Sequence, residues 1–106
     1  MTYIMNGILW TVRFVNSNSP LLMRSNKTMT IGMCDRETHE ICLSDRLHGA
    51  MLRKVLIHEV THSAMMSYGI DMSVEQEELF CDLVATYGDE IFNVVDNLFT
   101  VLRRIA

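Results

Sequence analysis

The feature that most constrains the fold of this chain is a change in hydrophobic periodicity near residue 45. Before it, segments rich in β-branched and aromatic residues alternate with turn formers, as in ILWTVRFV followed by NSNSP. After it, apolar residues recur with a period near 3.6. A chain of 106 residues can bury one small core. We therefore predict a single α+β domain, with a β-rich part over residues 1–45 and a helical part over residues 46–106.

Two or three short strands are expected in the first part. Residues 8–15 read as one strand, and residues 27–34 and 39–44 as a hairpin around DRET. Together they predict a short antiparallel sheet, which must pack on other elements to be stable. The last strand contains EICLS. It is either an ordinary half-buried strand or one whose exposed edge binds a substrate peptide as an additional strand.

Two helices are clearly indicated in the second part. The first covers LHGAMLRKVLIHEVTHSAMMS and is expected to end near Gly69, which suits a C-cap. The second is expected over about residues 74–87. Ser73 and Gln76 have the spacing of a capping box at its start.

The last segment, about residues 89–105, is amphipathic and forms either a third helix or a kinked continuation of the second, because Gly88 precedes it. Its apolar positions follow steps of four and three: Ile91, Val95, Leu98, Leu102 and Ile105. Packing of this apolar face on the domain is the leading expectation. A homodimer or a partner protein bound through the same helix is the alternative.

Composition excludes several classes of function. The net charge is −4 without a cluster of Lys and Arg, so direct binding to nucleic acid is not expected. No window reaches the roughly 20 apolar residues of a membrane helix, and the first residues do not resemble a signal peptide. The cytoplasm is the expected compartment. Cys34, Cys42 and Cys81 lack CxxC spacing and are expected to be reduced thiols.

One short motif points to chemistry. In LIHEVTHSAM, His58 and His62 are four residues apart on a predicted helix, so both imidazoles project from one face. That spacing allows both rings to bind one zinc ion. Glu59 lies about 100° around the helix, where it can flank the ion and take a proton from a metal-activated water. This is the HExxH arrangement.

Catalytic zinc usually has three protein ligands, so a third is expected from the next helix, which contains EQEELFCDLVA. Glu78 and Asp82 share one helix face. Glu75 shares that face too, but its place in the first turn is typical of an acid that favours the helix N-terminus. Glu77 is expected to point elsewhere, into solvent. Glu78 is the leading candidate ligand, and Glu75 or no carboxylate at all are the alternatives.

HExxH followed by ExxxD, here Glu78 to Asp82, resembles the gluzincin metallopeptidases. The resemblance implies that Glu78 is the third zinc ligand and that the Asp82 carboxylate orients a zinc histidine. The chain is also similar to small metallopeptidases of the ImmA/IrrE-like kind, which implies a phage or prophage origin. A third histidine of the metzincin type is absent, since residues 63–70 contain none.

These residues predict a zinc-dependent peptidase that acts on a peptide or protein substrate, with Glu59 as general base. A tetrahedral intermediate also needs a donor for its oxyanion. Tyr68, Tyr87, His39 and His48 are the candidates, although packing at the helix end is the leading expectation for Tyr68, and an exposed position without a role is the leading expectation for the two histidines.

Two other readings remain open. The chain could bind zinc without turnover and act as an interaction protein of a phage or mobile element. It could also be a metal-free structural protein in which the motif is accidental. The last reading predicts that His58, His62 and Glu78 do not converge.

Overall fold

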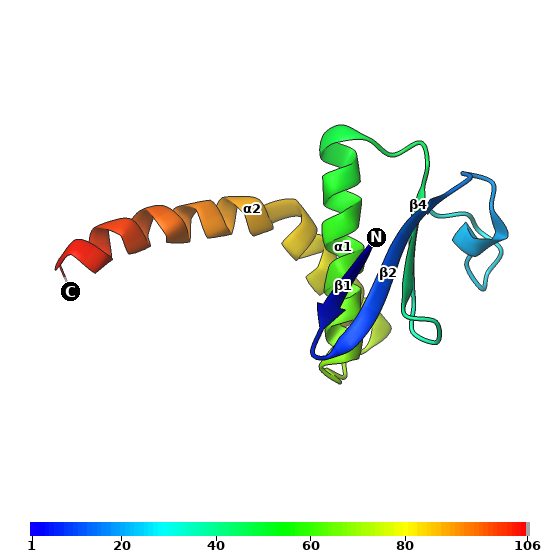
Figure 1. Ribbon diagram of the computed structural model, residues 1–106, viewed down its shortest axis with the longest axis horizontal. Coiled ribbons are helices and arrows are strands. Elements are labelled where there is room, and N and C mark those ends of the chain that lie inside the picture. The colour runs from blue at the N-terminus through cyan, green and yellow to red at the C-terminus, as the bar shows by residue number, and fades with distance from the viewer. Residues whose placement is uncertain (106) are drawn as a thin grey trace.

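The computed structural model describes residues 1–105 and has an α+β architecture (Figure 1). Four strands come first: β1 (Thr2–Met5), β2 (Ile8–Val15), β3 (Gly32–Asp35) and β4 (Glu40–Ser44), with a short 3-10 helix, η1 (Pro20–Leu22), after β2. Two helices follow, α1 (Gly49–Ser67) and α2 (Val74–Ile105). The predicted fold class is confirmed, and the change from strands to helices falls near residue 45 as expected.

The sheet is mixed, with strand order β1-β2-β4-β3. β1 pairs with β2, and β3 with β4, in antiparallel fashion, whereas β2 and β4 are parallel. The prediction of two or three antiparallel strands is therefore wrong in strand number and in the orientation of one pair. β1 was not predicted, although Asn6 and Gly7 have φ angles of 50° and 77° and form the two-residue turn that NG favours.

The predicted hairpin around DRET is present, but its strands lie differently in the sheet from what was expected. β3 begins only at Gly32, and the preceding residues form a loop closed by a bridge between Met23 and Met29. β4 is an inner strand between β2 and β3. The expectation that EICLS offers a free edge is therefore wrong, and the edge strand on that side of the sheet is β3.

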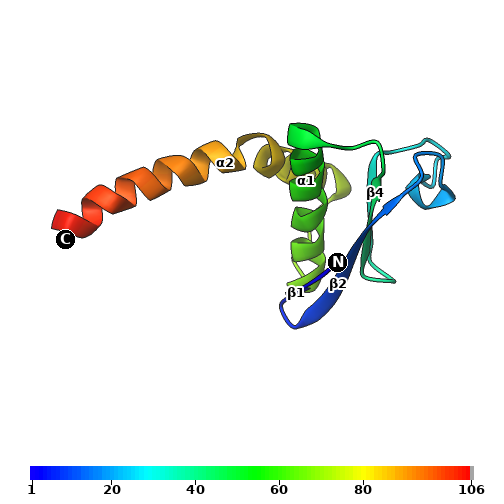
Figure 2. The ribbon, with the colours of Figure 1, turned by 45° about the horizontal axis from the view of Figure 1, so that its top comes forward.

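α1 packs on one face of the sheet (Figure 2). The buried core joins this helix to the two central strands through Trp10, Ile41, Leu43 and Val55. Two serines of α1 also bond to the sheet: the indole of Trp10 donates to Ser67 at 2.8 Å, and the hydroxyls of Tyr3 and Ser63 are 2.6 Å apart. Because these polar contacts are directional, they fix the rotation of α1 about its axis and thus which residues face away from the sheet.

The turn between the helices has the predicted caps. Gly69 adopts a φ of 62°, and the N–H of Ile70 donates to the carbonyl of Met65 at 2.9 Å, as at a glycine-terminated helix end. The Ser73 hydroxyl accepts from the N–H of Gln76 at 3.1 Å, and the Ser73 N–H donates to the Gln76 side chain at 3.3 Å. This capping box starts α2 so that its first half returns antiparallel beside α1.

α2 is one helix of 32 residues, so the segment after Gly88 continues the second helix, which is one of the two arrangements expected for it, and does not form a separate third helix. A single glycine costs a helix about 1 kcal/mol, which its neighbours can offset. The first half lies along α1, while the second half projects from the body of the molecule (Figures 1 and 2). The second half of α2 was expected to pack on the domain, and this expectation is wrong. α1 begins at Gly49, so it has no further residues against which the second half of α2 could pack. Within residues 1–105, no helix has the length and apolar character needed to cross a membrane.

Candidate metal centre

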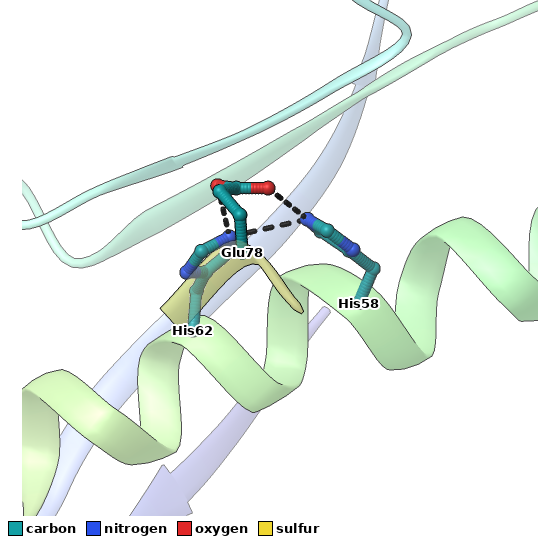
Figure 3. A group of neighbouring side chains, drawn as sticks. All are labelled: His58, His62 and Glu78. Atoms are coloured by element: carbon teal, nitrogen blue, oxygen red, sulfur yellow. Dashed lines mark hydrogen bonds and ion pairs between the residues drawn. The ribbon is translucent and has the colours of Figure 1, made fainter. Parts of the chain in front are cut away.

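His58 and His62 face the same side of α1, as their spacing predicts (Figure 3). Their Nε2 atoms are 3.1 Å apart. Glu78 approaches from the first half of α2, with Oε1 2.9 Å from Nε2 of His62 and Oε2 3.3 Å from Nε2 of His58. Each residue offers one ligand atom, and these three atoms lie within 4.8 Å of one another. The structure therefore brings the three predicted ligands together in a group that could hold a metal ion.

The other nitrogen of each imidazole contacts a carboxylate of α2. Nδ1 of His58 lies 3.0 Å from Asp82, the residue expected to orient a histidine. Nδ1 of His62 lies 2.7 Å from Glu77, whose side chain is only 18 % exposed. The expectation that Glu77 is solvated is therefore wrong, whereas the alternative ligand Glu75 is exposed and takes no part in the cluster.

These contacts favour one neutral tautomer of each ring. An ionised carboxylate only accepts hydrogen bonds, so each Nδ1 atom carries a proton and donates it. In a neutral imidazole the Nε2 atom is then an acceptor. Both Nε2 atoms face each other and the Glu78 carboxylate, so three acceptors converge without a donor between them. A cation at that point is the natural complement, and histidines that bind metals usually donate their second nitrogen in this way.

Glu59 lies beside the cluster without joining it. Its side chain is 7 % exposed and, among residues 1–105, has no hydrogen-bond or ion-pair partner. Burial raises the pKa of the Glu59 carboxyl above its ordinary value, and the nearby charge of Glu78 adds to the rise, while His58 and His62 oppose it. A carboxyl group with a raised pKa and free oxygens is suited to accepting and returning a proton.

Gly32 at the start of β3 makes room for Glu59. A Cβ atom built on Gly32 would lie 2.8 Å from Cγ1 of Val55 and 3.2 Å from Oε2 of Glu59. The first distance is shorter than real contacts allow, so only glycine fits here without movement of α1 side chains. β3 therefore passes directly over the Glu59 carboxylate. No pattern in the sequence pointed to this role of Gly32.

Two grooves meet at the cluster, with volumes of about 510 Å³ and about 270 Å³. The larger groove runs toward His62 and the smaller toward Asp82. Five residues line both: Arg24, Gly32, His58, Glu59 and Glu78. Arg24 belongs to the loop before β3 and was not predicted, because scattered basic residues give no pattern in the sequence. The positive charge of Arg24 lowers the pKa of the Glu59 carboxyl and so opposes the effect of burial.

The four predicted oxyanion donors lie elsewhere. Tyr68 caps the end of α1, is 56 % exposed and lines neither groove. His39 packs against Trp10 with ring centroids 5.0 Å apart, and His48 is the exposed N-cap residue of α1. Tyr87 lies on the outer part of α2, along an apolar groove. The described residues therefore place no tyrosine or further histidine at the cluster.

All three cysteines are free, as expected. Cys34 on β3 lines the larger groove, with its Sγ atom 3.9 Å from Sδ of Met66. Burial raises the pKa of the Cys81 thiol to about 12, and burial likewise raises the pKa of the Cys34 and Cys42 thiols. Among residues 1–105 no cysteine belongs to the group that could hold a metal ion, whose donors are the two imidazoles and Glu78.

Comparisons of the chain with protein-family models, curated proteins and solved structures found no match. The chemistry inferred for the cluster therefore rests on its geometry.

Proposed function

We propose that this chain is a zinc-dependent peptidase that hydrolyses a peptide or protein substrate. The observation that carries the proposal is the paired arrangement of His58 and His62, whose Nε2 atoms converge on Glu78 while both Nδ1 atoms contact carboxylates. The buried Glu59 beside it supplies a general base. The same residues carry the resemblance to gluzincins.

The donor set favours zinc. Two imidazole nitrogens and one carboxylate form a common catalytic zinc site that leaves a fourth position open. Ligands of a tetrahedral zinc ion are about 3.3 Å apart, given bonds of ~2.0–2.1 Å. The two Nε2 atoms are 3.1 Å apart, and the Glu78 carboxylate lies 2.9 Å from Nε2 of His62 through Oε1 and 3.3 Å from Nε2 of His58 through Oε2. When bound, zinc would act as a Lewis acid, polarising a carbonyl and easing deprotonation of water.

Glu59 would handle the proton. It would accept a proton from the attacking water as the new C–O bond forms, and donate it to the leaving amine as the C–N bond breaks. Burial raises the pKa of the Glu59 carboxyl, which makes its carboxylate a stronger proton acceptor than an ordinary glutamate.

Arg24 is the group best placed to stabilise the negative oxygen of the tetrahedral intermediate, since no tyrosine or additional histidine lines the grooves. It lines both grooves together with Glu59, and its guanidinium carries a permanent positive charge with several donors. An arginine in this place could also bind a substrate carbonyl or carboxylate.

The grooves suit an extended peptide. Both grooves are lined by His58, Glu59 and Glu78, so a peptide that occupies both would place one of its bonds near Glu59. β3 lines the larger groove and is an edge strand, so its free backbone groups could pair with the substrate in the way first assigned to EICLS.

Metal content tests the first half of the proposal. Wild-type protein purified without chelator or histidine tag should carry one equivalent of zinc, and Glu78→Ala should lose it or bind it far more weakly. Glu75→Ala is the matched control, one turn earlier on the same face, and should keep its zinc. Zinc absent from the wild type, with no thermal stabilisation on adding zinc, would rule the site out.

Hydrolysis tests the second half. Zinc-loaded protein is incubated with a mixed peptide pool and a denatured protein, and new termini are identified by mass spectrometry. Cleavage that is lost in Glu59→Gln is the expected result. One equivalent of zinc without cleavage would favour the second candidate, a zinc-binding interaction protein without turnover. The observation behind that candidate is the lack of any of the four predicted oxyanion donors at the cluster.

A further inference from the structure

The second half of α2 exposes an apolar face that the rest of the described chain does not cover. The ion pair between Arg53 and Asp89, at 2.7 Å, marks the last turn at which α1 accompanies α2. Beyond it, five residues form a stripe along the helix: Ile91, Val95, Leu98, Leu102 and Ile105, which are 47–76 % exposed. Further apolar side chains flank the stripe on both sides: Phe92, Val94, Phe99 and Val101. Exposure of this many adjacent apolar side chains indicates a binding surface.

The spacing of the stripe indicates what kind of surface covers it. Steps of four and three residues repeat every seven, which keeps an apolar seam facing a second helix. The same seam begins in the first half of α2, where Cys81 and Gly88 are buried beside α1. α1 therefore covers the seam up to Gly88, and another helix is needed beyond it.

We propose that this helix is the same segment of a second copy, paired antiparallel. In that arrangement Ile91 lies opposite Leu102 of the partner subunit, and Val95 opposite Leu98 of the partner subunit. Ile105 of the partner subunit then reaches Gly88, the point at which α1 stops. The apolar groove along Ile91, Val94 and Val95, of about 490 Å³, lies on this face and can receive the partner's side chains.

Charge selects the antiparallel direction. The segment carries acids near its start, Asp89 and Glu90, and the bases Arg103 and Arg104 near its end. An antiparallel pair places Glu90 near Arg104 of the partner subunit. On that side of the apolar stripe the flanking side chains are the short Val94 and Val101, so the two charged side chains can reach each other. A parallel pair would instead bring the arginines of both copies together, which is unfavourable.

The shape of the molecule allows this pairing. Each folded body lies at the start of its own α2, so antiparallel pairing places the two bodies at opposite ends, without overlap (Figure 2). The sixteen or so residues involved span about 24 Å at 1.5 Å per residue. Burying both apolar faces over that length provides on the order of 1,000 Å² in total, about the smallest area expected of a specific interface.

The test is the mass in solution of the full-length protein, by sedimentation equilibrium over a range of concentrations. A dimer is expected, and Leu98→Glu should convert it to monomer with the helix content and zinc content unchanged, because Leu98 is 57 % exposed in the single chain. Thr100→Glu, on the polar face of the same helix, is the matched control and should remain dimeric.

Charge-reversal variants, made singly and together, test both the antiparallel direction of the helix pair and the identity of the partner as a second copy. Glu90→Arg and Arg104→Glu should each weaken the dimer at least about threefold, because two exposed pairs become repulsive, and the double variant should recover wild-type affinity. A monomer at every concentration would overturn the proposal, as would a dimer unaffected by Leu98→Glu. Weakening by the single charge variants that the double variant does not reverse would also overturn it.

Discussion

The Oε2 atom of Glu77 lies 2.7 Å from the Nδ1 atom of His62, just as the Oδ1 atom of Asp82 lies 3.0 Å from the Nδ1 atom of His58. Each ring of the HExxH pair is thus held by its own carboxylate from α2. Such a contact fixes the tautomer and the orientation of a ligand ring, so it should govern metal affinity although Glu77 binds no metal itself.

We therefore expect Glu77→Gln to weaken zinc binding about 10–100-fold. The amide can accept the hydrogen bond but provides no negative charge. Competition against a chromophoric chelator measures the affinity, and Glu75→Gln, on the exposed side of the same turn, should bind zinc like the wild type. Equal affinities for the two variants would mean that Glu77 has only a packing role.

Glu59→Gln should separate metal binding from turnover. Hydrolysis should fall at least about 100-fold through loss of the general base, while the zinc stoichiometry remains one. The thermal stability of the zinc-free protein should not fall, because an amide costs less to bury than a carboxylate. A variant that loses its zinc would indicate that Glu59 is a ligand, contrary to the geometry.

Arg24→Ala should lower kcat by about 100-fold if the guanidinium stabilises the oxyanion, as loss of one such donor does elsewhere. Zinc content should not change, and Arg24→Lys should recover part of the rate. Arg36→Ala, in the exposed β3–β4 turn, is the control. A rise in KM at constant kcat would instead assign Arg24 to substrate binding.

Gly32→Ala should lower the rate of hydrolysis without removing the metal. The added methyl group requires Val55 to move and presses on Glu59, and the three atoms nearest to it belong to these two residues and not to His58 or His62. We expect a loss of about 1–3 kcal/mol in stability, typical of overpacking. Denaturant unfolding and zinc analysis of the same sample check both parts, and a fully active variant would show that the strand accommodates the methyl group freely.

The thiols should be inert in the folded protein at pH 8. Because the pKa of Cys81 is raised to about 12, its thiolate is scarce at pH 8, whereas an ordinary thiol with a pKa of about 8.5 is partly ionised. Alkylation should therefore be slow at pH 8, accelerate as the pH rises toward 12, and become complete on unfolding. Mass spectrometry after iodoacetamide treatment counts the modified cysteines, and rapid labelling of Cys81 in the folded state would contradict its burial.

The sequence predicted the parts of the fold and site that depend on local periodicity. Three such features depend only on residues a few positions apart in the sequence: the common face of His58 and His62, the capping box at Ser73 and the C-cap at Gly69. The convergence of Glu78 on the two rings follows from them, since a short turn between two helices leaves few ways for α2 to return.

What the sequence did not predict depends on contacts between distant segments. Glu77 was expected in solvent because the direction from which α1 approaches α2 cannot be read from α2 alone. Arg24 lies in the loop before β3 and Gly32 at the start of β3, and both meet a helix that begins many residues later in the sequence. The parallel pairing of β2 with β4 and the free second half of α2 are likewise decided by tertiary packing.

The candidate metal ligands and the carboxylates that contact their rings all come from one helix–turn–helix segment, residues 58–82. Contacts so close in sequence can form early in folding, before the sheet is complete, because little chain entropy is lost in closing a short loop. A captured ion would then act as a cross-link that holds α2 against α1. Arg24 and Gly32 reach the centre only through long-range pairing of the strands. Damage to the sheet should therefore leave a protein that still binds its metal but no longer turns over substrate.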